Sequence, residues 1–357
     1  MANALLYYFL IGQILLDCHG DWYPGECPPS FGQLPALLEE IVGYINNLNT
    51  TWKAGLNFQG NNQRSFVKLL LGNKLTTSTP PDRRLPMKPP SDLNPKEIPK
   101  SFDAVEKWPE CLSMRRISDQ GACGAGWAFG ALEAMSDRYC IFSKMKNLNV
   151  TLSAENLISC CGLQCGFGCE GGYPSAAWHY WVQAGIVTGG GFESSQGCQP
   201  YTFQPCRHVS EGSAEEDSAP TCAPMVQTPE CQTECRKGYN KSYSEDLHFG
   251  KSAYAVMNNV LQIEEEIMHF GPVEASMDIF EDFLSYKSGV YQHVIGKFIN
   301  KHSVKLYGWG VTSDGVKYWQ AANSWNENWG EKGFFRILQG ADECGIEEDV
   351  YAGVPLL

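Results

Sequence analysis

The residues with the clearest potential for chemistry lie in two places far apart along the chain. Residues 120–127 form a Gly-rich turn that runs into a helix-compatible segment, residues 127–140. A cysteine at 126, the start of such a helix, would be activated as a nucleophile, because the positive end of the helix dipole lowers the pKa of a thiol. Position 126 is Gly126, which has no side chain and cannot attack a carbonyl.

The second place holds an imidazole and its possible companions. His302 precedes a strand-like run, residues 304–310, and the triplet Asn323-Ser324-Trp325 follows it. A lone histidine beside a strand is more often structural than catalytic. An asparagine can orient an imidazole ring, however, and a tryptophan can cover that contact. These residues could form a pair in which the asparagine orients the imidazole of His302.

The amino-acid composition and the net charge argue against some classes of function. The chain has 357 residues, 43% of them hydrophobic, which is enough for one large domain or two ordinary ones. The formal charge is -13 and the acidic residues are dispersed. This balance argues against a nucleic-acid partner and against a polybasic membrane-binding surface.

The cysteines indicate an oxidising compartment. The chain has 15 of them, most between Cys111 and Cys235. A zinc site is disfavoured because paired C-x2-C knuckles are missing, so we expect no metal and no cofactor. A disulfide framework is the better interpretation.

The N-terminus agrees with a secretory route. Residues 4–16 are mostly apolar, about as long as the core of a signal peptide, and Gly20 is a plausible cleavage point, although no Lys or Arg precedes the apolar run. No later stretch reaches spanning length, so we expect no membrane span and a lysosomal or extracellular location. Three glycosylation sequons are present: Asn49-Thr50-Thr51, Asn149-Val150-Thr151 and Asn240-Lys241-Ser242.

The order of the predicted elements is typical of an α+β protein. Residues 34–48 repeat apolar side chains at helical spacing, and residues 79–99 are proline-rich, which predicts a linker with a domain boundary near 97. A helix at 263–269 should stop at Gly271-Pro272. Four strands are predicted after it: 286–294, 303–311, 318–322 and 333–338. A helical half therefore precedes a β-rich half.

Several motifs resemble the papain-like cysteine peptidases of family C1, in particular their cathepsin B branch. The matching stretches cover nearly the whole chain: residues 51–58, 101–104, 119–121, 127–130, 168–174, 286–293, 322–325 and 344–347. The resemblance implies a helical left domain and a β-barrel-like right domain with the active-site cleft between them. It also implies a signal peptide at 1–20, a propeptide at 21–97 and a peptidase domain at 98–357 with an occluding loop at about 198–235.

The resemblance implies a disulfide set as well. The pairs would be Cys111–Cys140, Cys123–Cys169, Cys160–Cys231, Cys161–Cys165, Cys198–Cys235 and Cys206–Cys222. Sequence alone does not prove a connectivity. With these pairs formed, Cys18 would leave with the signal peptide and Cys27 and Cys344 would be free. No cysteine would remain to act as the nucleophile.

Roles for single residues follow from the same resemblance. Gln120 matches the side-chain donor of the oxyanion hole, whose other donor is the backbone N–H of residue 126. Gly171 and Gly172 match the strip where the substrate backbone pairs, and Trp325 covers the His–Asn contact. Asp349 matches the floor of the S2 pocket and would favour a basic side chain there.

Two regions depart from the family pattern. Residues 300–303 read Asn-Lys-His-Ser where the family has Gly-Gly-His-Ala, and Lys301 is expected to add bulk and positive charge next to the cleft. The loop between Cys206 and Cys222 keeps one histidine, His208, where the family has a pair that binds a peptide C-terminus. His208 could still bind a carboxylate, or the loop could be a solvated, disulfide-closed segment.

The sequence therefore predicts a catalytically inactive homologue of a cysteine peptidase that keeps a peptide-binding cleft. One alternative is an active endopeptidase and dipeptidyl carboxypeptidase whose nucleophile was mutated or mis-sequenced. Another is an extracellular interaction protein on the same scaffold. The expected partners are peptide or protein ligands in the cleft, the chain's own propeptide and protease inhibitors.

Overall fold

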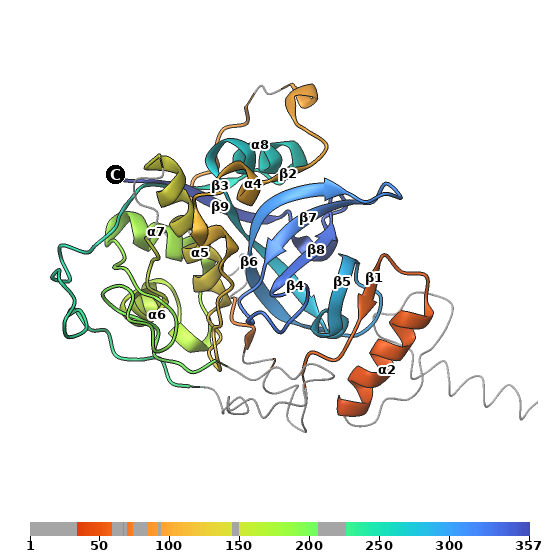
Figure 1. The fold of residues 1–357 in the computed structure, drawn as a ribbon, viewed down its shortest axis with the longest axis horizontal. Helices are drawn as coiled ribbons and strands as arrows, with labels where there is room; N and C mark the ends of the chain where they lie inside the picture. Colours follow the sequence, from red (N-terminus) through yellow and green to blue (C-terminus); the bar gives the residue numbers. More distant parts are fainter. Residues whose placement is uncertain are drawn as a thin grey trace, which may run out of the picture.

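The computed structural model describes residues 34–58, 67, 70–73, 84–91, 94–144, 150–205 and 226–357. Helices α5, α6 and α7 lie on one side of the molecule, and the strands β4–β8 lie on the other (Figure 1). The C-terminal strand β9 and its partner β3 reach from the strand side to the helical side (Figure 1). No helix in the described ranges has the length and apolar character needed to cross a bilayer.

The helices and strands have the following bounds. The helices are α2 Leu34–Asn47, α4 Ala104–Lys107, α5 Gly126–Phe142, α6 Ala154–Cys160, α7 Pro174–Gln183 and α8 Val260–Phe270, with 3-10 turns η3 Pro95–Glu97, η4 Leu112–Arg115, η5 Gly162–Gln164, η6 Gly168–Glu170, η7 Glu281–Ser285 and η8 Glu343–Gly345. The strands are β1 Trp52–Ala54, β2 Phe102–Asp103, β3 Gly250–Val256, β4 Val273–Phe280, β5 Tyr286–Tyr291, β6 Phe298–Val311, β7 Lys317–Ala322, β8 Phe334–Leu338 and β9 Asp349–Pro355.

The strands form a mainly antiparallel sheet in the order β1-β5-β8-β7-β6-β4-β9-β3, and β2 pairs with β6. The pair β5–β8 is parallel. In the register of β4 and β6, Met277 lies opposite His302 and Ser276 lies opposite Ser303. Ser276 also lies opposite Asp349 of β9. This register brings residues from three strands to one position in the sheet.

Helix α5 is the central helix of the helical side. Most of its residues are buried, as expected for a helix that is apolar nearly all round. Its buried charges are paired with residues of the strand side: Asp137 with Lys305 at 2.9 Å and Arg138 with Glu266 at 2.9 Å. The ion pairs tie the C-terminal half of α5 to β6 and α8.

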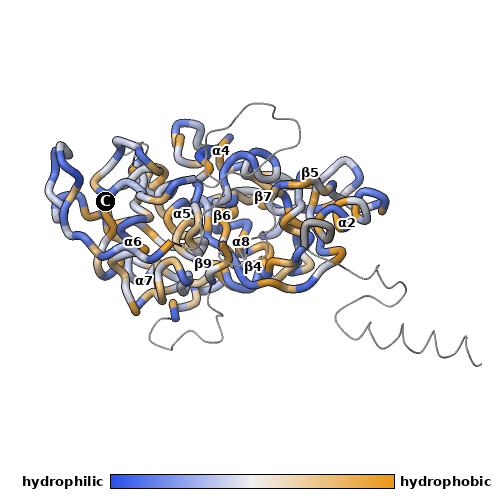
Figure 2. The backbone as a smooth tube through the Cα atoms, turned by 90° about the horizontal axis from the view of Figure 1, so that it is seen from below, coloured by the Kyte–Doolittle hydropathy of each residue, from blue (hydrophilic) through white to orange (hydrophobic). Residues whose placement is uncertain are grey.

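Residues 34–58 pack against the strand side. Strand β1 pairs antiparallel with β5, and the indole N–H of Trp52 donates to the carbonyl of Gln292 at 2.9 Å. Figure 2 shows α2 at one end of the molecule, close to β5, with hydrophobic and hydrophilic stretches alternating along it. Its buried side chains Leu38, Ile41 and Ile45 belong to the same core cluster as β4–β8. The N-terminal segment is therefore an integral part of this fold.

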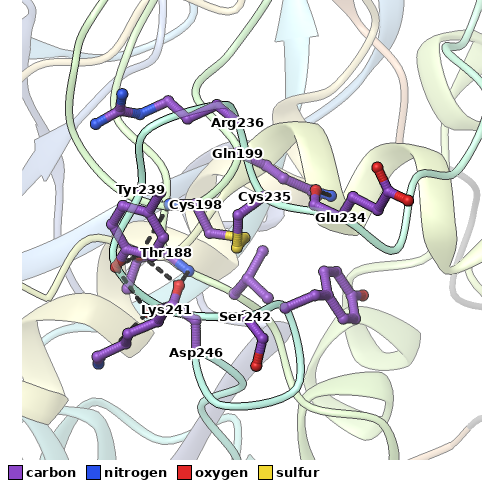
Figure 3. Close-up of a disulfide and its surroundings, with 12 residues drawn as sticks. Thr188, Cys198, Gln199, Glu234, Cys235, Arg236, Tyr239, Lys241, Ser242 and Asp246 are labelled. Atoms are coloured by element: carbon purple, nitrogen blue, oxygen red, sulfur yellow. Dashed lines mark hydrogen bonds and ion pairs between the residues drawn. A yellow bond between two sulfur atoms is a disulfide. The ribbon is translucent and has the colours of Figure 1, made fainter.

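Five disulfides lie among the described residues. They are Cys111–Cys140, Cys123–Cys169, Cys160–Cys231, Cys161–Cys165 and Cys198–Cys235. Cys206, Cys222, Cys18 and Cys27 lie outside the described residues. The Cys198–Cys235 bridge is flanked by the buried carboxylate of Asp246, which accepts hydrogen bonds from Thr188 and Tyr239 (Figure 3).

Candidate functional site

The turn that leads into α5 is held in place by backbone and side-chain contacts. Cys123 is bonded to Cys169, and the N–H of Gly124 donates to the carbonyl of Cys169 at 2.8 Å. The indole N–H of Trp127 donates to the carbonyl of Gly168 at 3.1 Å. These contacts fix the first turn of the helix, which begins at Gly126.

The imidazole of His302 on β6 faces this helix end and is held by Asn323. His302 Nε2 lies 2.9 Å from Asn323 Oδ1, which also accepts the backbone N–H of Ser324 at 2.8 Å. Because Oδ1 is an acceptor, we assign the ring proton to Nε2. The indole of Trp325 lies against the ring, with 5.0 Å between ring centroids. The structure thus brings the His–Asn–Trp set together.

The unprotonated nitrogen of His302 points at Gly126. A Cβ placed on Gly126 would lie 2.2 Å from His302 Nδ1 and 2.4 Å from Cε1, closer than the 3.0 Å that real Cβ atoms keep. The ring is fully buried, and Nδ1 has no hydrogen-bond partner in the described part of the chain. Burial lowers the pKa of His302 to about 4, so the ring is neutral above that pH. The imidazole occupies the space that a nucleophilic side chain would need.

Gln120 has its hydrogen-bonding groups fully engaged. Its Nε2 donates to the carbonyl of Leu70 at 2.8 Å and to that of Cys123 at 2.7 Å, and its Oε1 accepts from the hydroxyl of Ser324 at 2.7 Å. The side chain is completely buried. The expected oxyanion donor therefore binds a backbone carbonyl of residues 70–73.

Residues 70–73 pass directly over the helix N-terminus and the glycine strip. The carbonyl of Gly72 accepts the N–H of Gly172 at 2.8 Å. A Cβ on Gly72 would lie 1.8 Å from the carbonyl oxygen of Gly124, and a Cβ on Gly171 would lie 2.1 Å from that of Gly72. The two backbones approach this closely only because both positions are glycine.

The opposite wall of the cleft is the stretch that departs from the family pattern. Asn300 Nδ2 donates to the carbonyl of Leu71 at 2.7 Å, and the N–H of Asn73 donates to the carbonyl of Lys301 at 3.3 Å. The ammonium of Lys301 pairs with Asp278, the residue opposite it on β4, at 3.0 Å. The positive charge expected next to the cleft therefore has a partner, because the strand register places a carboxylate opposite Lys301.

Sequence reasoning missed a polar pocket next to His302. The side chain of Asn73 points between the hydroxyls of Ser276 and Ser303. Glu274 lies two residues from Ser276 on β4 and accepts from the indole of Trp178 at 2.7 Å. Burial raises the pKa of Glu274 to about 8, so its carboxyl is protonated in acid. In the sequence, this pocket is indicated by Ser303, which stands where the family pattern has alanine.

Two further candidate residues, Asp349 and His208, and two histidines without a predicted role, His248 and His293, remain to be placed. Asp349 begins β9 opposite Ser276, while His208 lies outside the described residues. His248 Nδ1 contacts the carbonyl of Asp246 at 2.6 Å, and His293 pairs with Asp282 at 3.1 Å. Neither histidine joins the cleft.

Among the described residues, the arrangement holds a peptide backbone, and position 126 at the start of α5 carries no side chain. Carbonyls of residues 70–72 are held by Gln120, Asn300 and the N–H of Gly172. Cys344 is the free cysteine of the described ranges, and burial and the neighbouring Glu343 raise the pKa of its thiol well above the ordinary value. A thiol held in that form is a poor nucleophile.

Comparison with known proteins agrees with this geometry. The family model for papain family cysteine proteases matches residues 98–354, and that for the peptidase family C1 propeptide matches residues 37–77. The chain is 45% identical to a cathepsin B-like cysteine proteinase of Schistosoma japonicum over 90% of this chain and 92% of that protein. It is 46% identical to cathepsin B-like cysteine proteinase 6 of Caenorhabditis elegans over 89% of this chain and 83% of the relative.

A solved structure supports the same assignment. The proCathepsin B S9 of Trypanosoma congolense superimposes with a TM-score of 0.71 at 35% identity, covering 88% of this chain and 97% of that chain. The predicted α+β papain-like fold with a propeptide is confirmed, and residues 70–73 lie within the matched propeptide. The chain therefore belongs to the papain family of cysteine proteases, among its cathepsin B-like members.

Proposed function

We propose that this protein is a catalytically inactive cathepsin B-like homologue that binds peptide segments in its cleft without cleaving them. The observation that carries the proposal is the relation between Gly126 and His302. A cysteine peptidase needs a thiolate beside the imidazole. Here the helix N-terminus carries glycine, and the ring nitrogen lies 2.2 Å from the point where a Cβ would stand.

The hydrogen-bond donors that line the cleft support the proposal that it retains a peptide. Gln120 and Gly172 still donate to backbone carbonyls, and Asn300 adds a donor that the family pattern lacks. Five disulfides among the described residues suit the secretory route, so we propose a lysosomal or extracellular location.

Peptidase assays test the proposal directly. The purified zymogen would be incubated at acidic pH and assayed on an Arg-Arg peptide substrate, beside Gly126→Cys and Gly126→Ala variants. We expect no turnover above the Gly126→Ala background from the unmodified protein. Turnover that a thiol-directed epoxide inhibitor blocks would contradict inactivity.

The Gly126→Cys variant separates two causes of inactivity. Its Cβ needs the His302 ring to withdraw, because the two would otherwise overlap. Restored turnover would mean that the nucleophile alone is missing. A folded but inactive Gly126→Cys protein would mean that the collapsed imidazole or the occupied cleft also prevents catalysis.

A further inference from the structure

The pocket around Asn73 is built from two buried hydroxyl groups. Asn73 Nδ2 lies 2.8 Å from Ser303 Oγ and 3.2 Å from Ser276 Oγ. The two hydroxyl oxygens lie 3.3 Å apart, and Asn73 is 3% exposed. The two N–H bonds of one primary amide therefore find two acceptors in a site without access to water.

The strand register creates this pair. Ser276 of β4 lies directly opposite Ser303 of β6, so their side chains share one face of the sheet. Helix α5 closes the pocket from the other side, where a Cβ on Gly130 would lie 3.1 Å from the Cβ of Ser303. Residues on three elements thus define a small polar pocket with little spare room.

The backbone contacts fix which side chain enters the pocket. The carbonyls of Leu71 and Gly72 are held by Asn300 and by the N–H of Gly172, and the N–H of Asn73 reaches the carbonyl of Lys301. With three successive residues held in this way, the side chain of residue 73 is directed at the two hydroxyls. The amide oxygen of Asn73 has no partner in the described ranges, so the donors provide the recognition.

We propose that Ser276 and Ser303 form a selectivity pocket for a side-chain carboxamide, so that the cleft prefers peptide segments with asparagine at this position, and that Asn73 is its resident occupant. The proposal rests on the proposed peptide-binding function and names its ligand class. A leucine would lose both hydrogen bonds and leave the hydroxyls only each other as partners. An aspartate would bury a negative charge in the pocket, close to the carboxyl of Glu274. Serine at 303, where the family pattern has alanine, is the residue that distinguishes this pocket.

Hydrogen exchange on the full-length protein gives the first test. Ser303→Ala, Ser276→Ala and Asn73→Leu should each speed exchange of the Asn73 and Gly172 amides by about tenfold, as expected for one lost hydrogen bond. Ser143→Ala is the matched control, because the Ser143 hydroxyl donates at 3.0 Å to the carbonyl of Cys140 at the C-terminal end of α5. Unchanged exchange in Ser303→Ala and Asn73→Leu would overturn the proposal.

Peptide binding in trans gives the second test. A Gly72→Val substitution should displace residues 70–73 from the cleft of the full chain, because its Cβ meets the backbone of Gly124. Fluorescent peptides with the sequence of residues 67–76 would then be titrated with Asn, Leu, Asp or Arg at the place of Asn73. We expect the Asn peptide to bind about tenfold more tightly than the others, and this preference to disappear when Ser303→Ala is added.

The outcomes are distinguishable. Equal affinity for the Asn and Leu peptides, or a preference for Arg, would overturn the carboxamide pocket and leave the peptide-binding cleft intact. Failure of all four peptides to bind a folded Gly72→Val protein would overturn the cleft itself. If Gly72→Val does not fold, hydrogen exchange in Ser303→Ala alone tests the carboxamide pocket, because this substitution leaves residues 70–73 unchanged.

Discussion

The Nδ1 atom of His302 lies 2.2 Å from the position of a Cβ on Gly126. The ring packs against the indole of Trp325, and its Nε2 lies 2.9 Å from Asn323 Oδ1. The imidazole therefore lies in the volume that a side chain at position 126 would occupy.

Gly126→Ala should destabilise the protein although alanine favours helices. The added methyl must displace a buried ring, and overpacking of this kind costs about 1–3 kcal/mol. Gly43 is the matched control, since it lies in α2 with nothing within 4 Å of its Cβ position. Gly43→Ala should gain about 0.5–1 kcal/mol. Urea unfolding with disulfides intact measures both, and an equal gain in the two variants would contradict the crowding at 126.

Asn300 and Lys301 should differ in their effect on propeptide retention. Asn300→Gly removes the side-chain donor to Leu71, whereas Lys301→Ala removes only the pair with Asp278 and keeps the carbonyl that Asn73 uses. We expect Asn300→Gly to weaken retention about threefold to tenfold, the effect of one hydrogen bond, and Lys301→Ala to leave it unchanged.

Retention can be followed after the proline-rich linker is cut. Arg83-Arg84 gives a basic cleavage point, and size-exclusion chromatography at pH 5 then reports release of the propeptide fragment. A comparison of the two variants separates the effect of the Asn300 side chain on propeptide release from the effect of any other substitution at residues 300–301. Faster release from Lys301→Ala than from Asn300→Gly would refute the assignment.

The sequence predicted the long elements because their patterns are local. The helix predicted at 127–140 is α5 at Gly126–Phe142, and that predicted at 263–269 is α8 at Val260–Phe270, which ends at Gly271 with φ of 99°. Strands β1, β2, β3, β4 and β9 were not predicted individually. The three residues of β1 carry no periodic signal, and β1 exists because residues far along the chain in β5 pair with it.

The site could be predicted only where sequence motifs mark its residues. Gly126, His302 and Asn323 were picked out by the resemblance of their flanking motifs to the family, and the structure brings the three together. The placement of residues 70–73 in the cleft was not predictable, because its contacts use backbone carbonyls that every residue has. The pairing of Lys301 with Asp278 also depends on strand register, which the sequence leaves open.

Glu274 should make stability depend on pH. Burial raises the pKa of its carboxyl from 4.5 to about 8, so between these values the native state binds a proton that the unfolded state releases. Stability from this group therefore falls as pH rises from 4.5 to 8, by at most about 1.4 kcal/mol per pH unit. Glu274→Gln keeps an acceptor for Trp178 and should flatten this dependence.

Urea unfolding at pH 5 and pH 8 tests the Glu274 assignment. The loss of stability between the two pH values should be smaller in Glu274→Gln than in the unmodified protein. Glu110→Gln, at an exposed position, is the control and should keep the original loss. Identical pH dependence in Glu274→Gln and Glu110→Gln would contradict the role of the buried carboxyl.

We expect the buried carboxylate of Asp246 to hold in place the segment beside the Cys198–Cys235 bridge. Its buried carboxylate accepts from the N–H of Thr188 at 2.8 Å and from the hydroxyl of Tyr239 at 2.8 Å, and it lies 3.6 Å from Lys241 Nζ (Figure 3). Asp246→Asn replaces one acceptor oxygen with a donor, so a buried donor loses its partner at a cost of about 1–3 kcal/mol. We expect a lower urea midpoint and faster tryptic cleavage after Lys241, whereas Glu234→Gln, at an exposed position next to Cys235, should change neither. A tryptic rate equal in the two variants would mean that the disulfide, and not the carboxylate, holds this segment.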